Sequence, residues 1–237
     1  MKNMRLDKFL SECGLCTRSE SKVLIKKGVV MVNGKKAEKG DIKIDPENDE
    51  IVFKGEKVQY SQFEYYMLNK PAGVVSATED KNDKTVIDLV PKPHAKDIFP
   101  VGRLDKDTEG LLIITNDGEL AHNLLSPKKH VDKTYFVRTQ GGAVTEKDGE
   151  AFENGVDIGE KTLTLPAELK IIKSGEISES ELTIREGKFH QVKRMFKAVG
   201  KEVIYLKRIS MGGLKLDEGL EKGECRRLRE EEIEGLK

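Results

Sequence analysis

The first sixty residues carry the most specific local folding signals of the chain. Apolar side chains recur at helical spacing over residues 6–13. Thr17-Arg18-Ser19-Glu20 has the form of a capping box, in which the threonine side chain accepts from a free backbone amide and the glutamate reaches back. A β-prone run at residues 29–32 precedes Asn33-Gly34, a pair typical of a two-residue hairpin turn. We therefore expect two short helices followed by a small sheet.

Basic residues are concentrated in two segments of a chain whose formal net charge is zero. Residues 1–40 carry ten Lys and Arg against four Asp and Glu, and residues 185–208 carry eight against two. Such segments indicate contact with a polyanion, although a solvated surface would show the same charge. The basic residues at exposed positions of the first module are Arg5, Lys8, Arg18, Lys22, Lys26, Lys27, Lys35 and Lys36.

The first module resembles an S4-type RNA-binding domain over residues 4–57. The resemblance rests on RLDKFL at residues 5–10, TRS at residues 17–19 and GVVMVNG at residues 28–34. It implies that the module binds RNA through its exposed cations. The expected RNA-binding residues here are Arg5, Lys8, Arg18, Lys22, Lys26 and Lys35.

The rest of the chain mixes strand-like and helix-like segments without a regular βαβ alternation, which favours an α+β class. Residues 54–63 are short and polar and are interpreted as a linker. Strands are expected at residues 65–68, 111–115, 134–137 and 182–184, and helices at residues 119–125 and 191–198. We predict two domains, residues 1–60 and residues 61–237.

A polar loop bounded by Gly102 and Gly110 runs directly into the apolar segment 111–115. Loops at strand ends are frequent positions for catalytic groups, although an Asp-rich surface turn would have the same composition. The acids also imitate the start of a calcium-binding EF-hand loop. The twelfth position, however, is Asn116 where a bidentate glutamate is needed, so calcium is not expected.

This loop resembles the central motif of the pseudouridine synthases, in which Arg-Leu-Asp precedes Thr-x-Gly-Leu-Leu. The resemblance implies that Asp105 is the catalytic aspartate and that Arg103 helps to turn the target base out of the RNA. Asp107 and Thr108 match motif positions that look structural. The family implies a mixed, mainly antiparallel sheet for the catalytic domain.

The segment 186–196 surrounds His190 with cations and apolar residues. Its apolar members, Phe189, Val192, Met195 and Phe196, recur at helix-like spacing and are expected in the core. Lys193 and Arg194 are consecutive, so they would point in different directions on a helix. The segment resembles the His-Gln-x-basic motif of the family. This implies that Lys193 pairs with the catalytic carboxylate and keeps it ionised, while His190 and Arg194 contact RNA.

Two shorter segments complete the family pattern. Tyr135 stands in a Lys-x-Tyr sequence that implies an active-site tyrosine stacking on the target base, although a strand tyrosine is more often a core residue. Lys70-Pro71 matches a further motif, and by itself would be a rigid turn that ends a strand. The four segments occur in family order, and with the first module the resemblance covers nearly the whole chain.

The architecture and the detail of residues 190–196 are similar to the RsuA-type synthases, which act on 16S rRNA. This implies 16S rRNA as the partner, naked or within an assembling small subunit. A large-subunit (23S) rRNA synthase shares the same plan and stays open. A non-catalytic RNA-binding assembly factor is a second alternative, but an acidic loop would repel RNA unless one of its acids is used.

No cofactor is expected, because the isomerisation of uridine oxidises nothing and imports no group. Cys13 and Cys16 have the C-x-x-C spacing, yet no second pair exists and the four histidines are scattered, so neither metal nor redox use is expected. The sequence contains no apolar stretch that could span a bilayer and no signal-peptide pattern at its start. We expect a cytoplasmic monomer that does not contact membranes.

Overall fold

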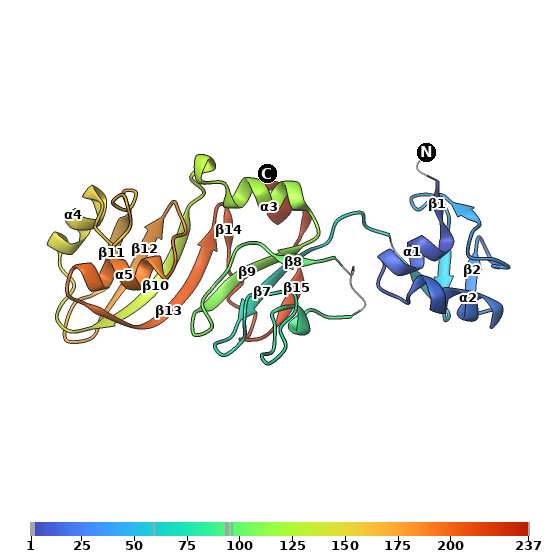
Figure 1. Ribbon diagram of the computed structural model, residues 1–237, viewed down its shortest axis with the longest axis horizontal. Helices are drawn as coiled ribbons and strands as arrows, with labels where there is room; N and C mark the ends of the chain where they lie inside the picture. Colours follow the sequence, from blue (N-terminus) through green and yellow to red (C-terminus); the bar gives the residue numbers. More distant parts are fainter. Residues whose placement is uncertain (1–2, 59, 93–94, 96, 237) are drawn as a thin grey trace. The chain divides into compact units, whose positions relative to one another are not determined.

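The chain divides into two compact units, shown in Figure 1. The computed structural model describes residues 3–58, 60–92, 95 and 97–236. Unit 1 comprises Met1–Glu64 with Pro91–Ile98, and unit 2 comprises Tyr65–Val90 with Phe99–Lys237. The segment Pro91–Ile98 thus groups with unit 1 although it follows the first strand of unit 2 in the sequence. That residues 1–60 and 61–237 are separate domains stays a prediction.

The helices of unit 1 begin where the sequence predicts. They are α1 (Leu6–Glu12) and α2 (Arg18–Lys26). The capping box is confirmed, since the backbone amide of Glu20 donates to Thr17 Oγ1 at 3.1 Å and the amide of Thr17 donates to Glu20 Oε2 at 2.7 Å. Each bond satisfies an amide that the first helical turn leaves free. The helices bury Leu6, Phe9, Leu10 and Ile25 in a core shared with the strands.

A small antiparallel sheet completes unit 1. Its strands lie in the order β3-β2-β5-β6, and β1 pairs separately with β4. The bounds are β1 Met4–Arg5, β2 Val30–Val32, β3 Lys35–Lys36, β4 Lys43–Ile44, β5 Ile51–Phe53 and β6 Glu56–Val58. Asn33 and Gly34 form the predicted tight turn with φ of 50° and 76°, as a type I′ hairpin requires. The expected linker over residues 54–63 is wrong at its start, because Glu56–Val58 pairs with β5; Gln59 lies outside the described residues.

Unit 2 is built on one mixed sheet with nine strands among the described residues, and the expected α+β class is confirmed. The order is β11-β12-β10-β13-β9-β7-β15, with β14 beside β13 and β8 beside β9. Between these strands β13 and β9 pair in parallel, and the other described pairings are antiparallel. The bounds are β7 Tyr65–Lys70, β8 Phe99–Pro100, β9 Glu109–Thr115, β10 Lys133–Gln140, β11 Glu168–Lys173, β12 Ser178–Ile184, β13 Glu202–Met211, β14 Leu214–Lys215 and β15 Cys225–Arg227.

Strand β9 forms the centre of unit 2. Every residue from Glu109 to Thr115 is buried, which agrees with the uninterrupted apolar run in the sequence. Gly110 has a φ of 100°, and a Cβ at this position would lie 2.2 Å from the carbonyl oxygen of Arg208. Only glycine therefore lets β9 approach β13 so closely. The polar loop 102–108 leads directly into β9 next to this close contact.

Several helices of unit 2 pack against its sheet. α4 (Glu146–Asn154) lies beside β11 and α5 (Gln191–Ala198) beside β13, as Figure 1 shows. Phe152 of α4 and Phe196 of α5 meet edge to face, with centroids 5.2 Å apart. The remaining elements are α3 Gly118–Leu125, α6 Glu230–Glu234 and the short 3-10 helices Ile87–Leu89 and Pro127–Lys129. Within the described residues, no helix is long and apolar enough to cross a bilayer.

One glutamate of the C-terminal acidic run, residues 230–232, is held by an arginine. Arg226 donates to both carboxylate oxygens of Glu232, at 2.9 and 2.8 Å, and the backbone amide of Arg229 donates to Glu232 Oε2 at 2.8 Å. The hydrogen bonds from Arg226 outweigh partial burial and lower the pKa of Glu232 to about 2. Glu232 therefore fastens α6 to β15.

Replacing Glu232 with glutamine should lower the unfolding free energy at pH 7 by about 1–3 kcal/mol, because a charge-assisted pair is lost. The folded-state pKa lies below the ordinary value of 4.5, so this stabilisation is complete above pH 4.5 and is lost as the pH falls toward about 2. Urea denaturation at pH 7 and pH 3 measures both effects. Glu231→Gln, at an exposed neighbouring position, is the matched control, and equal stability of the two variants would contradict the assignment.

Candidate active site

A buried lysine fixes the backbone of the polar loop 102–108. Lys70 at the end of β7 donates through Nζ to the carbonyl oxygens of Asp105 (3.0 Å), Thr108 (2.9 Å), Lys106 (3.4 Å) and Pro71 (3.1 Å). Burial lowers the pKa of Lys70 to about 8, although the carboxylates of Asp107 and Asp105 act in the opposite direction. The loop thus has a defined conformation where it carries its acidic residues.

The structure brings three of the expected site residues together. Lys193 Nζ lies 3.0 Å from Asp105 Oδ2, and His190 Nε2 lies 3.5 Å from Asp105 Oδ1. The side chain of Asp105 is 27% exposed, so it is both held in place and open to a ligand. An acid in the loop before β9 therefore meets a base that lies 88 residues further along the chain, on α5.

Lys193 also holds a second carboxylate. Its Nζ lies 2.6 Å from Asp107 Oδ1, and the side chain of Asp107 is 73% exposed. Partial burial opposes the charge of Lys193, but its hydrogen bonds to Asp107 and Asp105 outweigh this and raise the pKa of Lys193 above its usual value. The hydrogen bond from Lys193 also lowers the pKa of Asp107. Lys193 is therefore cationic at neutral pH.

A tight turn positions the start of α5. His190 precedes the helix with a left-handed φ of 49°. The amide of Lys188 donates to Gln191 Oε1 at 2.9 Å, and Gln191 Nε2 donates to Glu186 Oε1 at 2.9 Å. This turn aims His190 and Lys193 at the loop that carries Asp105.

The expectation that all four apolar residues of this segment lie in the core is wrong for one of them. Val192, Met195 and Phe196 are buried, whereas Phe189 is 66% exposed. The left-handed turn at His190 breaks the helical periodicity, because Phe189 lies before the first residue of α5. The ring of Phe189 instead stacks on His190, with centroids 3.7 Å apart and an interplanar angle of 22°.

The two expected RNA-binding arginines of unit 2 differ in their surroundings. Arg194 points away from Lys193, as consecutive helix positions require, and donates to Glu160 Oε1 (2.8 Å), to the carbonyl of Phe189 (2.9 Å) and to the carbonyl of Ile158. Arg103 is exposed and has no hydrogen bond or ion pair with the part of the chain that the structure describes. Of these two arginines, Arg103 is therefore the one whose guanidinium is unengaged within the described structure.

Tyr135 lies on β10, opposite Arg208 of β13, which in turn lies beside Gly110 of β9. Tyr135 is 7% exposed, and no hydrogen bond or ion pair joins it to Asp105 or Lys193 in the described structure. Arg208 is 2% exposed and donates through Nε to the carbonyl of Leu111 at 2.8 Å, while its Nη2 has no partner among the described residues. The sheet register thus places Tyr135 near the start of β9, without a hydrogen bond to the Asp105 carboxylate among the described residues.

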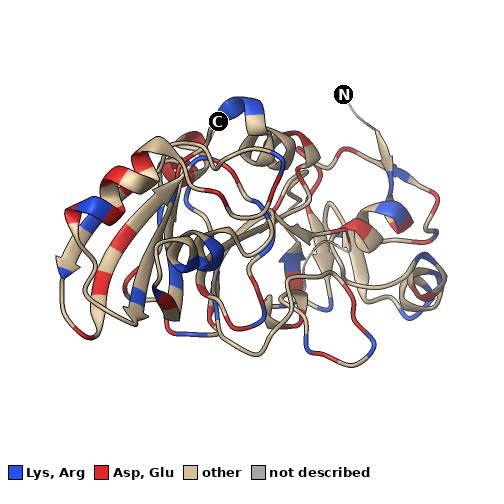
Figure 2. Ribbon diagram, turned by 60° about the vertical axis from the view of Figure 1, so that its left-hand side comes forward, with Lys and Arg blue, Asp and Glu red and all other residues tan. Residues whose placement is uncertain are grey.

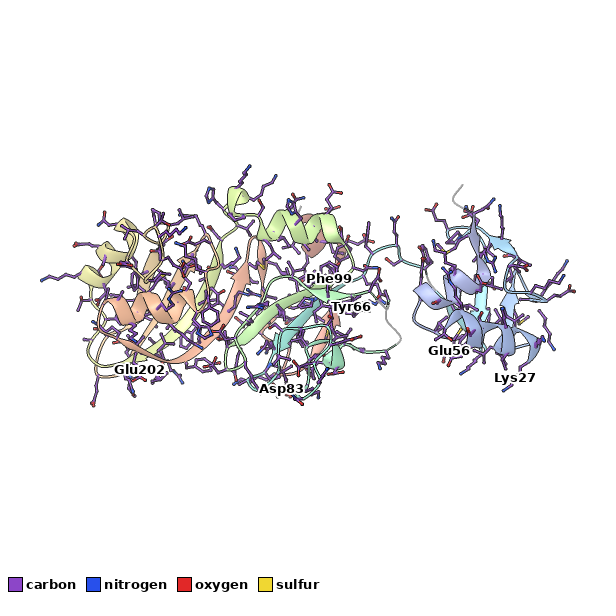
Figure 3. All side chains as sticks on the ribbon, viewed as in Figure 1. Lys27, Glu56, Tyr66, Asp83, Phe99 and Glu202 are labelled. Atoms are coloured by element: carbon purple, nitrogen blue, oxygen red, sulfur yellow. The ribbon has the colours of Figure 1, made fainter. Side chains whose placement is uncertain are left out.

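The third acid of the loop region has partners that the sequence did not indicate. Glu109 accepts from Tyr205 (2.7 Å) and pairs with Lys222 (2.7 Å). Burial acts to raise the pKa of Glu109, but these two donors outweigh it and lower the pKa. Lys106 of the loop pairs with Asp83, which is labelled in Figure 3. Glu109 and Lys106 are therefore neutralised by contacts outside the Asp105–Lys193 pair.

The expected RNA-binding residues of unit 1 fall into two groups. Arg5 pairs with Asp7 at 2.7 Å and Lys8 with Glu12 at 3.4 Å. The other four are exposed, and their side chains form no ion pair or hydrogen bond with any described residue: Arg18, Lys22, Lys26 and Lys35. The first three recur every four residues and so share one face of α2, whose basic residues are blue in Figure 2.

The cysteines are not arranged as a metal or redox centre. Cys13 packs against the core of unit 1, and burial raises the pKa of its thiol to about 12. A thiol with such a pKa is a poor metal ligand and a poor nucleophile at neutral pH. No group of three or more His, Cys, Asp or Glu side chains in the described residues could hold a metal ion.

Comparison with known proteins agrees with this geometry. Residues 64–198 match the RNA pseudouridylate synthase family model, and residues 4–51 match the S4 domain model. The uncharacterized RNA pseudouridine synthase YtzG of Bacillus subtilis (strain 168) is 52% identical over 97% of both chains. The ribosomal small subunit pseudouridine synthase A of Haemophilus influenzae is 42% identical, covering 98% of this chain and 99% of the relative.

A solved structure is similar over almost the same length. A crystal structure of a pseudouridylate synthase has a TM-score of 0.69 and 41% sequence identity, covering 98% of this chain and 99% of the other. The fold, the family models and full-length relatives agree. This chain therefore belongs to the RNA pseudouridine synthase family and carries an S4 domain at its N-terminus.

Proposed function

We propose that this enzyme converts a specific uridine of 16S ribosomal RNA to pseudouridine, with Asp105 as the catalytic residue. The observation that carries the proposal is the partly exposed carboxylate of Asp105, held 3.0 Å from Lys193 on a loop fixed by Lys70. The small-subunit substrate is supported by relatives named ribosomal small subunit pseudouridine synthase A, such as those of Haemophilus influenzae and Vibrio cholerae at 42% identity.

The reaction breaks the C1′–N1 bond of uridine, turns the uracil and joins C1′ to C5. The C5 proton leaves, N1 takes up a proton, and nothing is oxidised, so no cofactor is needed. An ionised carboxylate can attack the sugar or the base, or stabilise the cation that develops at C1′. Asp105 is assigned this role, and Lys193, 3.0 Å away, orients its carboxylate. Asp107 is not assigned a chemical step, because it is the more exposed of the two acids that Lys193 holds.

The target uridine must leave its stack before Asp105 can reach it, which costs a few kcal/mol. Arg103 is assigned to fill the space that the base vacates, because its side chain is exposed and unengaged within the described structure. Tyr135 is assigned to stack on the extruded uracil, a contact worth about 1–3 kcal/mol. Two further residues are assigned to contact the RNA strand: His190, which lies beside Asp105, and Arg194, which lies in the first half of α5.

Arg103→Ala should slow modification about 10- to 100-fold while weakening RNA binding much less, because the arginine stabilises the flipped state rather than the ground-state complex. Single-turnover rates and dissociation constants on a 16S rRNA transcript separate the two effects. Lys106→Ala, which removes an exposed cation of the same loop that pairs with Asp83, is the matched control. Equal losses of rate and affinity in Arg103→Ala would reduce Arg103 to a phosphate contact.

We further propose that residues 1–60 act as the RNA-binding domain and residues 61–237 as the catalytic domain of a cytoplasmic monomer. The unpaired cations Arg18, Lys22, Lys26 and Lys35 are assigned to phosphate contacts. Arg5 and Lys8 are assigned to the same surface, although each also has an acidic neighbour. Light scattering of the purified protein measures its mass in solution and so tests whether it is a monomer.

Lys22→Ala should weaken binding to rRNA and reduce the slope of log K against log salt by about 0.7–1, the change expected for one lost phosphate contact. Lys57→Ala provides the control, since Lys57 is an exposed lysine of unit 1 that pairs with Glu50 at 3.0 Å. Binding titrations at several salt concentrations measure both slopes. An unchanged slope in Lys22→Ala would count against the role of this face of α2.

The substrate is tested by mapping pseudouridines in rRNA from a strain that lacks the gene. The proposal requires that one pseudouridine disappears from 16S rRNA and returns when the gene is restored. Loss of a 23S pseudouridine instead would assign the enzyme to the large subunit. Tritium release by the purified enzyme, from free 16S rRNA and from assembling particles, then identifies the form on which it acts.

A further inference from the structure

Phe189 is the most exposed of the large hydrophobic side chains that the structure describes, at 66%. A phenylalanine side chain left in water forgoes the favourable burial of its ring. The sequence around it gives no local reason for this exposure, since the neighbouring apolar residues Val192, Met195 and Phe196 are all buried. The ring is therefore available to a partner outside the chain.

The turn that carries Phe189 is held from several sides. Its carbonyl accepts from Arg194 Nη1 at 2.9 Å, and the amide of Arg194 donates to the carbonyl of His190 at 3.0 Å. Lys188 and Gln191 close the turn through the amide of Gln191, which donates to the Lys188 carbonyl at 3.1 Å. The ring is therefore preorganised, so little conformational entropy is lost when a partner binds to it.

The ring is also next to the catalytic carboxylate. One face of Phe189 stacks on His190 at 3.7 Å between centroids, and His190 Nε2 lies 3.5 Å from Asp105 Oδ1. The edge of the His190 imidazole thus faces the Asp105 carboxylate, and the face of the same imidazole carries the phenyl ring. When the target nucleoside lies at Asp105, Phe189 is placed for its neighbour in the strand rather than for the target itself.

We propose that Phe189, supported by His190, stacks on an unpaired nucleobase that flanks the target uridine in the RNA strand. This inference rests on the proposed function, because it takes Asp105 as the position of the target. The occupant is RNA because the substrate strand must pass the Asp105 carboxylate, and Arg103 offers its unengaged cation on the same loop. Stacking on an aromatic face tolerates any base, so Phe189 selects an unstacked strand and not a particular nucleotide.

The test compares Phe189→Leu, which keeps an apolar side chain but loses the π face, with Phe189→Trp, which keeps it. Binding to a full-length 16S rRNA transcript is measured in an Asp105→Asn background, where no turnover occurs. Phe189→Leu should raise the dissociation constant roughly 5- to 150-fold, and Phe189→Trp should restore tight binding. Ile177→Ala removes a hydrophobic side chain that is 49% exposed, in the turn between β11 and β12, and should leave binding unchanged.

Turnover by variants that retain Asp105 separates a contact with the flanking base from a contact with the target. The single-turnover rate at saturating RNA should stay within a few-fold of wild type in Phe189→Leu. Wild-type affinity of Phe189→Leu, or a loss that Phe189→Trp does not restore, would overturn the inference. A defect seen only with assembling particles, and not with the naked transcript, would also overturn it and point to a protein contact.

Failure of this inference and failure of the proposed function give different results. If the wild-type enzyme releases no tritium from any 16S rRNA substrate, the proposed function fails whatever Phe189 does. If the wild type is active and Phe189→Leu binds the transcript equally well, only the stacking role is lost. Thermal unfolding of each variant confirms that the substitution leaves the fold of unit 2 intact.

Discussion

Replacement of Asp105 by asparagine is expected to reduce tritium release from C5-labelled uridine in 16S rRNA by about 10⁴-fold or more. Losses of this size follow when the nucleophile of a covalent mechanism is removed. Asparagine has nearly the same shape and can still accept from Lys193 Nζ, which lies 3.0 Å from the carboxylate. It has no negative charge, however, and can neither attack the nucleoside nor stabilise a cation at C1′.

Asp107→Asn is the matched control for this substitution. Both acids contact the nitrogen of Lys193, at 3.0 Å and 2.6 Å, and both lie in the loop before β9. Because Asp107 is largely exposed and has no assigned chemical step, its loss should reduce the rate by roughly tenfold or less, through a less firmly held Lys193. Comparable losses in the two variants would show that the pair acts only as a structural anchor. Activity of Asp105→Asn near the wild-type level would remove Asp105 from the mechanism.

The sequence predicted best those elements whose stability is encoded within a few residues. The capping box joins Thr17 and Glu20, three positions apart, and the turn at Asn33-Gly34 follows from the positive φ that these two residues tolerate. The fully buried strand β9 was also predicted, because its apolar run has no other stable placement than a sheet interior. Local chemistry determines such elements, whatever surrounds them.

The elements that sequence reasoning missed depend on distant partners. The helix α4 has the sequence EKDGEAFEN, with a glycine in its interior, and it buries Phe152 against Phe196 of α5. Such a short helix is stabilised by packing and not by propensity. The contact of Glu232 with Arg226 could not be predicted, because nothing in the run of glutamates at residues 230–232 distinguishes the one that the arginine binds. Helical periodicity places Phe189 in the core, because it does not reveal the left-handed turn at His190.

The candidate site could be predicted from family resemblance but not from composition or spacing. Asp105 and Lys193 come together because β9 pairs in parallel with β13, while α5 lies beside β13 and begins at a fixed turn. None of these contacts is visible in a single sequence. The role of Lys70 as a donor to four carbonyl groups could likewise not be foreseen, since a buried lysine without a carboxylate at its nitrogen is an uncommon arrangement.

Removal of the amine from the site, in Lys193→Met, is expected to reduce the rate by about 10²- to 10³-fold, the usual effect of losing one preorganised electrostatic contact. Lys193 has a raised pKa and is charged at neutral pH, so in the wild-type enzyme the Asp105 carboxylate lies next to an ammonium group. Without it, the carboxylates of Asp105 and Asp107 repel each other, and the pKa of Asp107 rises toward its ordinary value because its main hydrogen bond is gone.

Three results should therefore accompany the loss of the Lys193 amine. Activity of Lys193→Met should depend more strongly on pH than that of the wild type, because the hydrogen bond from Lys193 no longer lowers the pKa of Asp107. Lys193→Arg should recover part of the rate, since it restores the charge with a different geometry. The effect should fall on kcat and not on KM, because the amine acts on the carboxylate and not on the RNA. A Lys193→Met enzyme with a wild-type rate and pH profile would show that Asp105 needs no partner, and the assignment of the ion pair to catalysis would then fail although its geometry stands.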